Sequence, residues 1–142
     1  MVSVKDTPMY NELIKEFNYH FGDVFLFDGY AVAEAKEGII FNWEEHGRVI
    51  AEDVFNFLGV TDGANLAYIS NRINSFSVVP GDWLKFYKYS SSLKSYSIVS
   101  QSKGTLIGSM IENLFFKGKI KRFNSIYTAI DWIKKDMSQV VK

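Results

Sequence analysis

An Asp-Gly pair, Asp28-Gly29, separates two apolar runs and constrains the fold of this chain more than any other local feature. The runs, Val24–Phe27 and Tyr30–Ala35, have the length and residue types of β-strands. An Asp-Gly pair between two such runs is typical of a two-residue hairpin turn in which both turn positions adopt positive φ. The sequence therefore predicts a fold that opens with antiparallel strands.

A helix is predicted to begin at Asn42. The side chain of Asn42 can cap the first turn, and Glu45 three residues later completes a capping-box pattern. Gly59 is predicted to end this helix. The apolar positions recur at spacings of three and four and define one buried face, which consists of Trp43, Gly47, Ile50, Val54 and Phe57.

The later sequence alternates between further strands and helices. The short apolar run from Leu66 to Ile69 favours a strand that is covered on both faces of a sheet. Strands are also predicted at about 94–99 and 119–123, and helices at about 80–90, at 105–116 and near the C-terminus. The inward face of the last helix is expected to consist of Ile126, Ile130, Ile133 and Met137.

This order of elements predicts a single α/β domain over residues 1–142. Its mixed β-sheet opens with an antiparallel hairpin, continues with parallel strands and is packed by about four helices. The core is expected to extend from about residue 16 to about residue 137, between a short flexible N-terminus and a C-terminal tail. With 47% apolar and 16% aromatic residues, a chain of this length can bury such a core.

Charge is balanced over the whole chain but not along it. The 16 basic and 16 acidic residues cancel, yet residues 1–71 carry a net charge of −8 and residues 72–142 a net charge of +8. If the two halves occupy different faces, the resulting dipole favours self-association, so a homodimer is one expectation. If the halves interleave within one domain, the charges pair locally instead.

No targeting or membrane segment is predicted. The first eight residues lack the apolar run of a signal peptide. No apolar stretch approaches the roughly 20 residues that are needed to cross a bilayer. We therefore expect a cytoplasmic protein without membrane insertion.

No residue pattern in the sequence indicates a reaction. The absence of cysteine excludes a disulfide, a thiol nucleophile and a thiolate metal site. His20 is expected to be exposed on a strand and His46 to border the buried face of the first helix, and their spacing is not that of paired metal ligands. Neither a Gly-x-Ser-x-Gly elbow nor a phosphate-binding glycine loop occurs. We expect a non-enzymatic protein with no catalytic residues, metal or cofactor.

The best candidate site is the polar run that follows the predicted central strand. It would leave the carboxyl end of that strand, where open α/β sheets place their ligand crevices. The guanidinium of Arg72 offers a planar set of donors for a carboxylate or a phosphate. Alternatively, the same side chains only satisfy the backbone of a turn. The predicted binding residues are Ser70, Asn71, Arg72, Asn74, Ser75 and Ser77.

A cluster of basic residues lies beside three phenylalanines and is a second candidate site. It consists of Lys117, Lys119, Lys121 and Arg122. Basic residues among aromatic ones can bind single-stranded nucleic acid. Lysines also protect a short edge strand from pairing, in which case the phenylalanines belong to the core. The neutral charge of the chain favours the edge strand, so we expect no nucleic-acid partner.

Two parts of the chain carry a family resemblance. The first extends from Leu66 to Ser77, and the second consists of Ile111-Glu112-Asn113-Leu114-Phe115-Phe116 with the later Phe123-Asn124 and Ala129-Ile130-Asp131-Trp132. Both resemble small bacterial SpoIIAA-like proteins of the STAS superfamily, which is named for sulfate transporters and anti-sigma-factor antagonists. The resemblance covers roughly Glu16 to Trp132 and implies a mixed sheet with helices packed on it.

The resemblance implies a regulatory module that acts through contacts with a partner protein, with the loop 70–77 as its surface. The antagonists use a serine in an Asp-Ser-Ser-Gly-type motif, whereas the matching positions here read Ser70-Asn71-Arg72-Ile73, without the aspartate and the glycine. The alternative function is binding of a small anionic or lipid-like ligand near the same loop. A concave apolar pocket with Arg72 at its rim would favour ligand binding, and a flat, filled surface would favour protein contacts.

Overall fold

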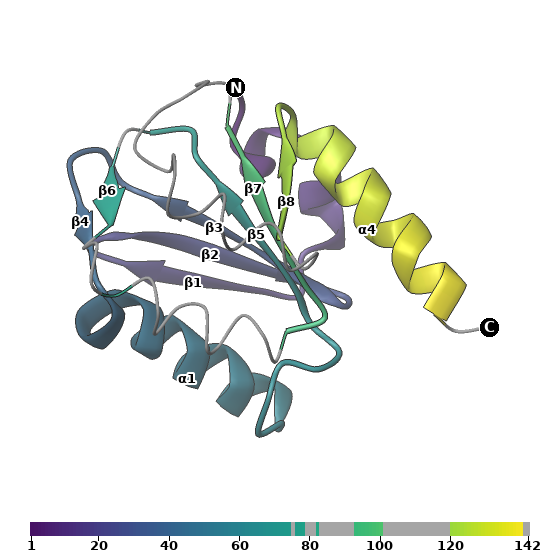
Figure 1. Ribbon diagram of the computed structural model, residues 1–142, viewed down its shortest axis with the longest axis horizontal. Helices are drawn as coiled ribbons and strands as arrows, with labels where there is room; N and C mark the ends of the chain where they lie inside the picture. The colour runs from purple at the N-terminus through teal and green to yellow at the C-terminus, as the bar shows by residue number, and fades with distance from the viewer. Residues whose placement is uncertain (75, 79–81, 83–92, 101–119, 141–142) are drawn as a thin grey trace.

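Six strands form the main sheet of the computed structural model, which describes residues 1–74, 76–78, 82, 93–100 and 120–140 (Figure 1). In spatial order the strands are β1 (Lys15–Tyr19), β2 (Gly22–Phe27), β3 (Tyr30–Ala35), β5 (Ala67–Asn71), β7 (Ser95–Val99) and β8 (Ile120–Phe123). Two short strands pair separately in parallel, namely β4 (Ile40–Phe41) and β6 (Ser77–Val78). The strands predicted near residues 66–69, 94–99 and 119–123 are thus present.

The sheet is mixed, as predicted. Strands β1, β2 and β3 are antiparallel neighbours, whereas β3, β5, β7 and β8 run parallel to one another. The Asp28-Gly29 pair connects β2 to β3, which confirms the predicted hairpin. The predicted turn conformation is wrong, because Gly29 has a φ of 83° while Asp28 keeps a negative φ; among the described residues only glycines adopt positive φ.

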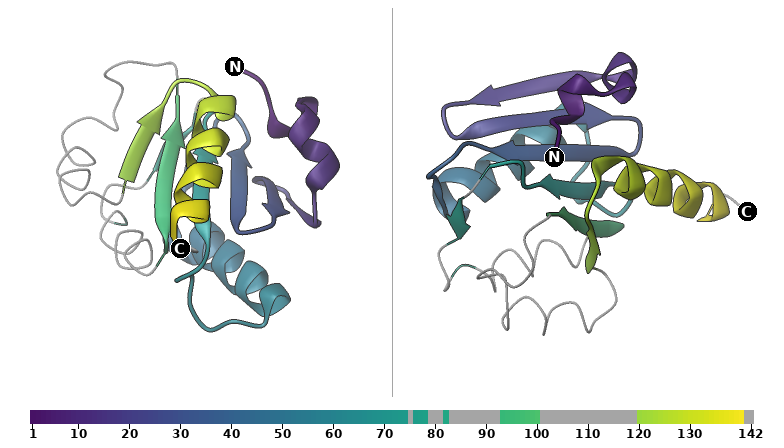
Figure 2. Two further views of the ribbon diagram at one scale, coloured as in Figure 1. Left: turned by 90° about the vertical axis from the view of Figure 1, so that its right-hand side faces the viewer. Right: turned by 90° about the horizontal axis from the view of Figure 1, so that it is seen from above.

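Helices cover both faces of the sheet. One face packs against α1 (Arg48–Leu58), and the opposite face packs against α4 (Ile126–Val140) together with the N-terminal 3-10 turns η1 (Val4–Asp6) and η2 (Pro8–Glu12) (Figure 2). We predicted about four helices, and these two α-helices are confirmed. The helices expected at 80–90 and 105–116 lie outside the described residues. Neither of the two described α-helices has the length and apolar character needed to span a bilayer.

Strand alternation divides the core into two clusters. On β2, Phe25 and Phe27 pack toward α4, whereas Val24 and Leu26 pack toward α1. The central strand β5 contributes to both clusters, and its Ile69 is completely buried. This confirms that the run beginning at Leu66 is hidden in the middle of the sheet. On α4, Ile126, Ile130 and Ile133 are buried as predicted, and the side chain of Met137 is outside the described part of the structure.

The first helix begins as predicted, but the backbone N–H of its capping residue bonds to a different side chain than predicted. The side chain of Asn42 accepts a hydrogen bond of 2.7 Å from the backbone N–H of Glu45, and a π-helical turn η3 (Trp43–Gly47) follows. The backbone N–H of Asn42 donates to Nδ1 of His46 at 2.9 Å, so His46 takes the role that the capping-box pattern assigned to the Glu45 side chain. Phe57 is 48% exposed, so its assignment to the buried face is wrong.

The N-terminal segment is attached to the end of the sheet. Val4 is completely buried, and its backbone N–H donates to Oε2 of Glu34 at 2.8 Å. The Ser3 hydroxyl donates to Oε1 of Glu34 at 2.6 Å, and Nδ2 of Asn71 donates to Oε2 at 2.9 Å. We expected a short flexible N-terminus, and these contacts instead attach it to β3 and β5.

Strand β8 forms one edge of the main sheet, as predicted for the basic segment. Lys121 and Arg122 are exposed, while Phe123 is partly buried against the ring of Trp132. These positions match an edge strand protected by basic residues. Lys117 and Lys119 lie outside the described residues.

Candidate functional site

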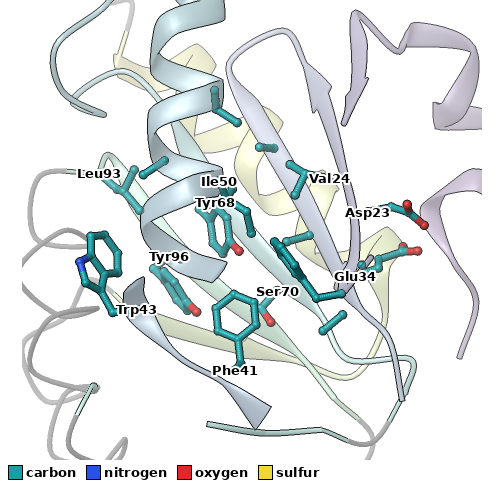
Figure 3. Close-up of a pocket in the computed structure, with 18 of the residues that line it drawn as sticks. Asp23, Val24, Glu34, Phe41, Trp43, Ile50, Tyr68, Ser70, Leu93 and Tyr96 are labelled. Carbon is teal, nitrogen blue, oxygen red and sulfur yellow. The ribbon is translucent and has the colours of Figure 1, made fainter. Parts of the chain in front are cut away.

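A pocket of about 100 Å³ lies between α1 and the sheet face that carries Val24 (Figure 3). Its helix wall consists of residues 47, 50, 51, 54 and 55, which recur at the spacing of one helical face. Its sheet wall consists of two rows of directly paired residues, Val24–Ala33–Ser70 and Ala31–Tyr68–Tyr96. The pocket is therefore built from the alternation of four neighbouring strands, β2, β3, β5 and β7, and from one helical face.

Small residues on both walls leave this space open. Ala31 and Ala33 lie on the sheet wall, and Gly47 and Ala51 lie on the helix wall. Each of these side chains ends at or before Cβ, so the larger residues around them do not close the gap between helix and sheet. A packed interior normally contains few voids larger than a water molecule. A space of this size beside the core is consequently a candidate for a ligand.

Two stacked tyrosines form part of the sheet wall. The rings of Tyr68 on β5 and Tyr96 on β7 have centroids 5.2 Å apart and an interplanar angle of 29°. Their hydroxyl groups point in the same direction (Figure 3). Burial is the main cause that raises the pKa of both hydroxyls above the ordinary 10, so both remain protonated at neutral pH. Each can therefore donate a hydrogen bond to an acceptor in the pocket.

Arg72 lines the pocket just beyond the carboxyl end of β5. Its guanidinium carbon lies 4.3 Å from the centroid of the Phe76 ring, and its backbone N–H donates to the carbonyl of Val99 at 2.9 Å. Burial is the main cause that lowers the pKa of Arg72, and the guanidinium also interacts electrostatically with the Tyr96 and Tyr68 side chains. The residue nevertheless stays positively charged at neutral pH.

The Nε atom of Arg72 is buried and has no hydrogen-bond partner in the described part of the chain. Three other buried polar atoms share this property, but none belongs to a residue that lines the pocket: the Tyr30 hydroxyl, Asn71 Oδ1 and the Ser97 hydroxyl. Buried polar groups in proteins normally have a partner. Arg72 therefore brings a cationic group with an unsatisfied donor to the lining of an apolar pocket.

The acidic residues near the pocket are engaged elsewhere. Asp23 and Glu34 contribute to the lining, but their carboxylates point away from Tyr68 and Tyr96 (Figure 3). The Glu34 carboxylate receives the N-terminal hydrogen bonds described above. Asp23 Oδ1 accepts from Nδ2 of Asn18 at 2.8 Å. The charge presented to the pocket by the described residues is therefore that of Arg72.

The paired strands β4 and β6 supply a further aromatic wall. Phe41 on β4 and Phe76, which precedes β6, both line the pocket, with ring centroids 6.1 Å apart. Phe41 also stacks on His46 at 5.1 Å. Phe41 and Phe76 thus place aromatic rings in the lining, one next to Arg72 and the other next to His46 at the start of the first helix.

The structure brings together only part of the predicted site. Ser70 and Arg72 line the pocket. Asn71 belongs to β5 rather than to a loop and hydrogen-bonds to Glu34, and the exposed Asn74 donates to the carbonyl of Ala35 at 3.1 Å. These two asparagines have the backbone-supporting and structural roles of the alternative interpretation. Ser77 lies in β6, and Ser75 lies outside the described residues.

Sequence reasoning missed the tyrosines. In a strand, every second side chain points to the same face, so Tyr68 lies on the same face as Ser70 and Arg72. This signal was available in the sequence. Tyr96 could not be found in the same way, because its position next to Tyr68 depends on the pairing of β5 with β7.

The histidines do not indicate a metal site. His46 is buried at the edge of the core, as predicted, and burial lowers its pKa. His20 is exposed, as predicted, but it lies in the turn between β1 and β2 rather than on a strand. Within the described ranges, no three acidic or histidine side chains are grouped as metal ligands would be.

Comparison with known proteins does not identify a family for this chain. No protein-family model, no curated protein and no solved structure matches it.

Proposed function

We propose that this protein binds a small amphipathic carboxylic acid in the pocket between α1 and the sheet. The observation that carries the proposal is the unpartnered, buried Nε of Arg72 beside a concave apolar space. We expected a concave apolar pocket with Arg72 at its rim to favour ligand binding over protein contacts, and Arg72 lines this pocket. The acid places its apolar body among the small and aromatic residues and its carboxylate against Arg72.

The polar groups of the pocket suit a carboxylate. Arg72 supplies the charge and an unpaired donor, and the protonated hydroxyls of Tyr68 and Tyr96 supply further donors near it. Hydrogen bonds to a charged group are worth about 1.5–3 kcal/mol each. The carboxylates of Asp23 and Glu34 point away, so they do not repel the ligand. Small acids of about ten non-hydrogen atoms are expected to bind with Kd on the order of 1 mM.

Titration of the ¹⁵N-labelled full chain, followed by NMR, tests the proposal with defined probes. The acids are hexanoate, cyclohexylacetate and phenylacetate, and 2-phenylethanol is the uncharged comparator. At least one acid should bind saturably, and its affinity should exceed that of the alcohol by about tenfold or more, because the alcohol lacks the charge-assisted hydrogen bond.

Two substitutions locate the binding site. Arg72→Met should weaken acid binding by about tenfold or more, and Ala33→Leu should weaken it by filling the pocket. Arg48→Met is the matched control, because it removes the same charge from an exposed arginine that pairs with Glu44 and Glu52 on the outer side of α1. The proposal fails if no acid binds saturably, or if Arg48→Met weakens binding as much as Arg72→Met does.

The STAS-like architecture and the associated regulatory role stay predictions. They are supported by the mixed sheet that opens with an antiparallel hairpin and carries helices on both faces. The segment 70–77 is less suited to contact a partner protein than we expected, because Ser70 and Asn71 are buried in β5. Sedimentation of the purified chain alone would reveal a homodimer. Sedimentation of the chain mixed with a protein that it captures from its own cell would reveal a partner complex.

A further inference from the structure

We infer that the pocket selects an acid whose body is a single aromatic ring over a saturated acid of the same size. This inference rests on the proposed function, since it names the class of ligand that the same pocket takes. Its basis is the lining, in which seven aromatic residues stand beside five aliphatic residues larger than alanine. The aromatic residues are Phe21, Phe41, Trp43, Phe55, Tyr68, Phe76 and Tyr96.

The rings of the pocket present both faces and edges. Tyr68 and Tyr96 form a stacked pair on the sheet wall. Phe41 meets Phe76 at an interplanar angle of 55° and Phe21 at 77°, so these rings are tilted and edge-on to one another. Aromatic pairs prefer offset-stacked and edge-to-face arrangements and gain stability beyond that from buried area alone. A ligand ring placed among these residues can form both kinds of contact, and a saturated ring can form neither.

The volume limits the ligand to about one ring. An apolar cavity of about 150 Å³ lined by aliphatic and aromatic residues holds benzene. The present pocket of about 100 Å³ is partly open, so one ring fits only if part of the ligand remains at the opening. Arg72 lines the same pocket, so the acidic group need not be far from the ring. Phenylacetate, with one carbon between ring and carboxylate, has this form.

Small residues line the pocket together with the rings. Gly47 at the end of η3 and Ala51 on α1 belong to the helix wall, and Ala31 lies in the same paired row as Tyr68 and Tyr96. Because these residues end at or before Cβ, they leave room beside the aromatic side chains for the body of a ligand.

Phenylacetate and cyclohexylacetate are the decisive pair, because they share size and charge and differ in aromaticity. If burial of apolar surface alone determined affinity, the saturated acid would bind at least as tightly. We expect phenylacetate to bind about two- to tenfold more tightly, as the extra stability of aromatic pairs implies. The affinities are measured by NMR titration of the full chain.

Tyr68→Leu tests the origin of the preference and should reduce the affinity ratio to about one. Tyr127→Leu, at an exposed tyrosine on α4, is the matched control and should leave the ratio unchanged. Equal or tighter binding of cyclohexylacetate to the unaltered chain overturns the inference while the proposed function stands. Failure of both acids and of hexanoate to bind rejects the proposed function itself.

Discussion

The guanidinium carbon of Arg72 lies 4.3 Å from the centroid of the Phe76 ring, within the range of a cation–π interaction. This contact positions a cationic side chain whose Nε remains buried and unpaired in the described structure. The ring stabilises the charge at the pocket without occupying the hydrogen-bond donor. Under the proposed function, this cationic group attracts the carboxylate of the ligand.

Arg72→Met should leave the free energy of unfolding unchanged or raise it by up to about 1 kcal/mol. The substitution removes an unsatisfied buried donor and replaces it with an apolar side chain of similar length. The loss of the contact with Phe76 offsets part of this gain. Chemical denaturation measures the change, with Arg48→Met as the exposed control. A loss of 2 kcal/mol or more would show that Arg72 stabilises the fold rather than serving a ligand.

Glu34→Ala should destabilise the protein by about 3 kcal/mol. The substitution leaves the backbone N–H of Val4 and Nδ2 of Asn71 without their carboxylate partner. The exposed Glu37→Ala should change stability by less than about 0.5 kcal/mol, because surface substitutions usually have small effects. Equal effects of the two variants in urea denaturation would contradict the role assigned to Glu34 in holding the N-terminal segment.

Tyr30→Phe should stabilise the protein by up to about 1 kcal/mol, because the Tyr30 hydroxyl is buried without a partner. Burial raises the pKa of Tyr30 to about 12. Between pH 10 and 12 the unfolded chain loses the Tyr30 proton and the folded chain keeps it, so stability falls as the pH rises through this range. The Phe variant should lose less stability there. A destabilised variant would show that the hydroxyl does have a partner.

Acid destabilisation should depend on His46. Burial lowers its pKa below the ordinary 6.5, and its Nδ1 accepts from the backbone of Asn42, which requires the neutral ring. The unfolded chain therefore binds a proton at His46 before the folded chain does. The stability contributed by His46 is complete above about pH 6.5 and is lost as the pH falls toward the folded pKa.

Thermal unfolding between pH 5 and 7.5 measures this effect. His46→Asn should flatten the pH dependence, because an amide oxygen can accept the same hydrogen bond and does not titrate. His20→Asn is the comparison variant and should change the pH dependence less, because burial is the largest cause of the lowered pKa of His46 and the charge of His20 is a smaller one. If both variants behave like the unaltered chain, His46 does not determine acid stability.

Local signals in the sequence were sufficient for much of the fold. The Asp28-Gly29 pair predicted the hairpin, Asn42 predicted the start of a helix, and the apolar run at Leu66 predicted a buried central strand. Each signal acts over a few residues, so no tertiary contact was needed to find it. Phe57 was misassigned because helical spacing defines a face but does not say where the sheet beneath it ends.

The site was less accessible to sequence reasoning because it depends on strand pairing. Arg72 was identified from its place after a buried strand, but Asn71 next to it faces the opposite side of the sheet. Tyr96 reaches the pocket only through the register of β5 with β7. The hollow itself comes from small residues on elements that are far apart in the sequence, such as Ala33 and Gly47.

The most direct measurement is a map of phenylacetate binding on the assigned ¹H–¹⁵N NMR spectrum of the full chain. The account predicts saturable shifts at the amides of Ala33, Gly47 and Arg72, which line the pocket, and none at Ala129, a buried residue of α4 on the other face of the sheet. Saturable shifts confined to the α4 face, or no saturable shift with any of the three acids, would contradict it.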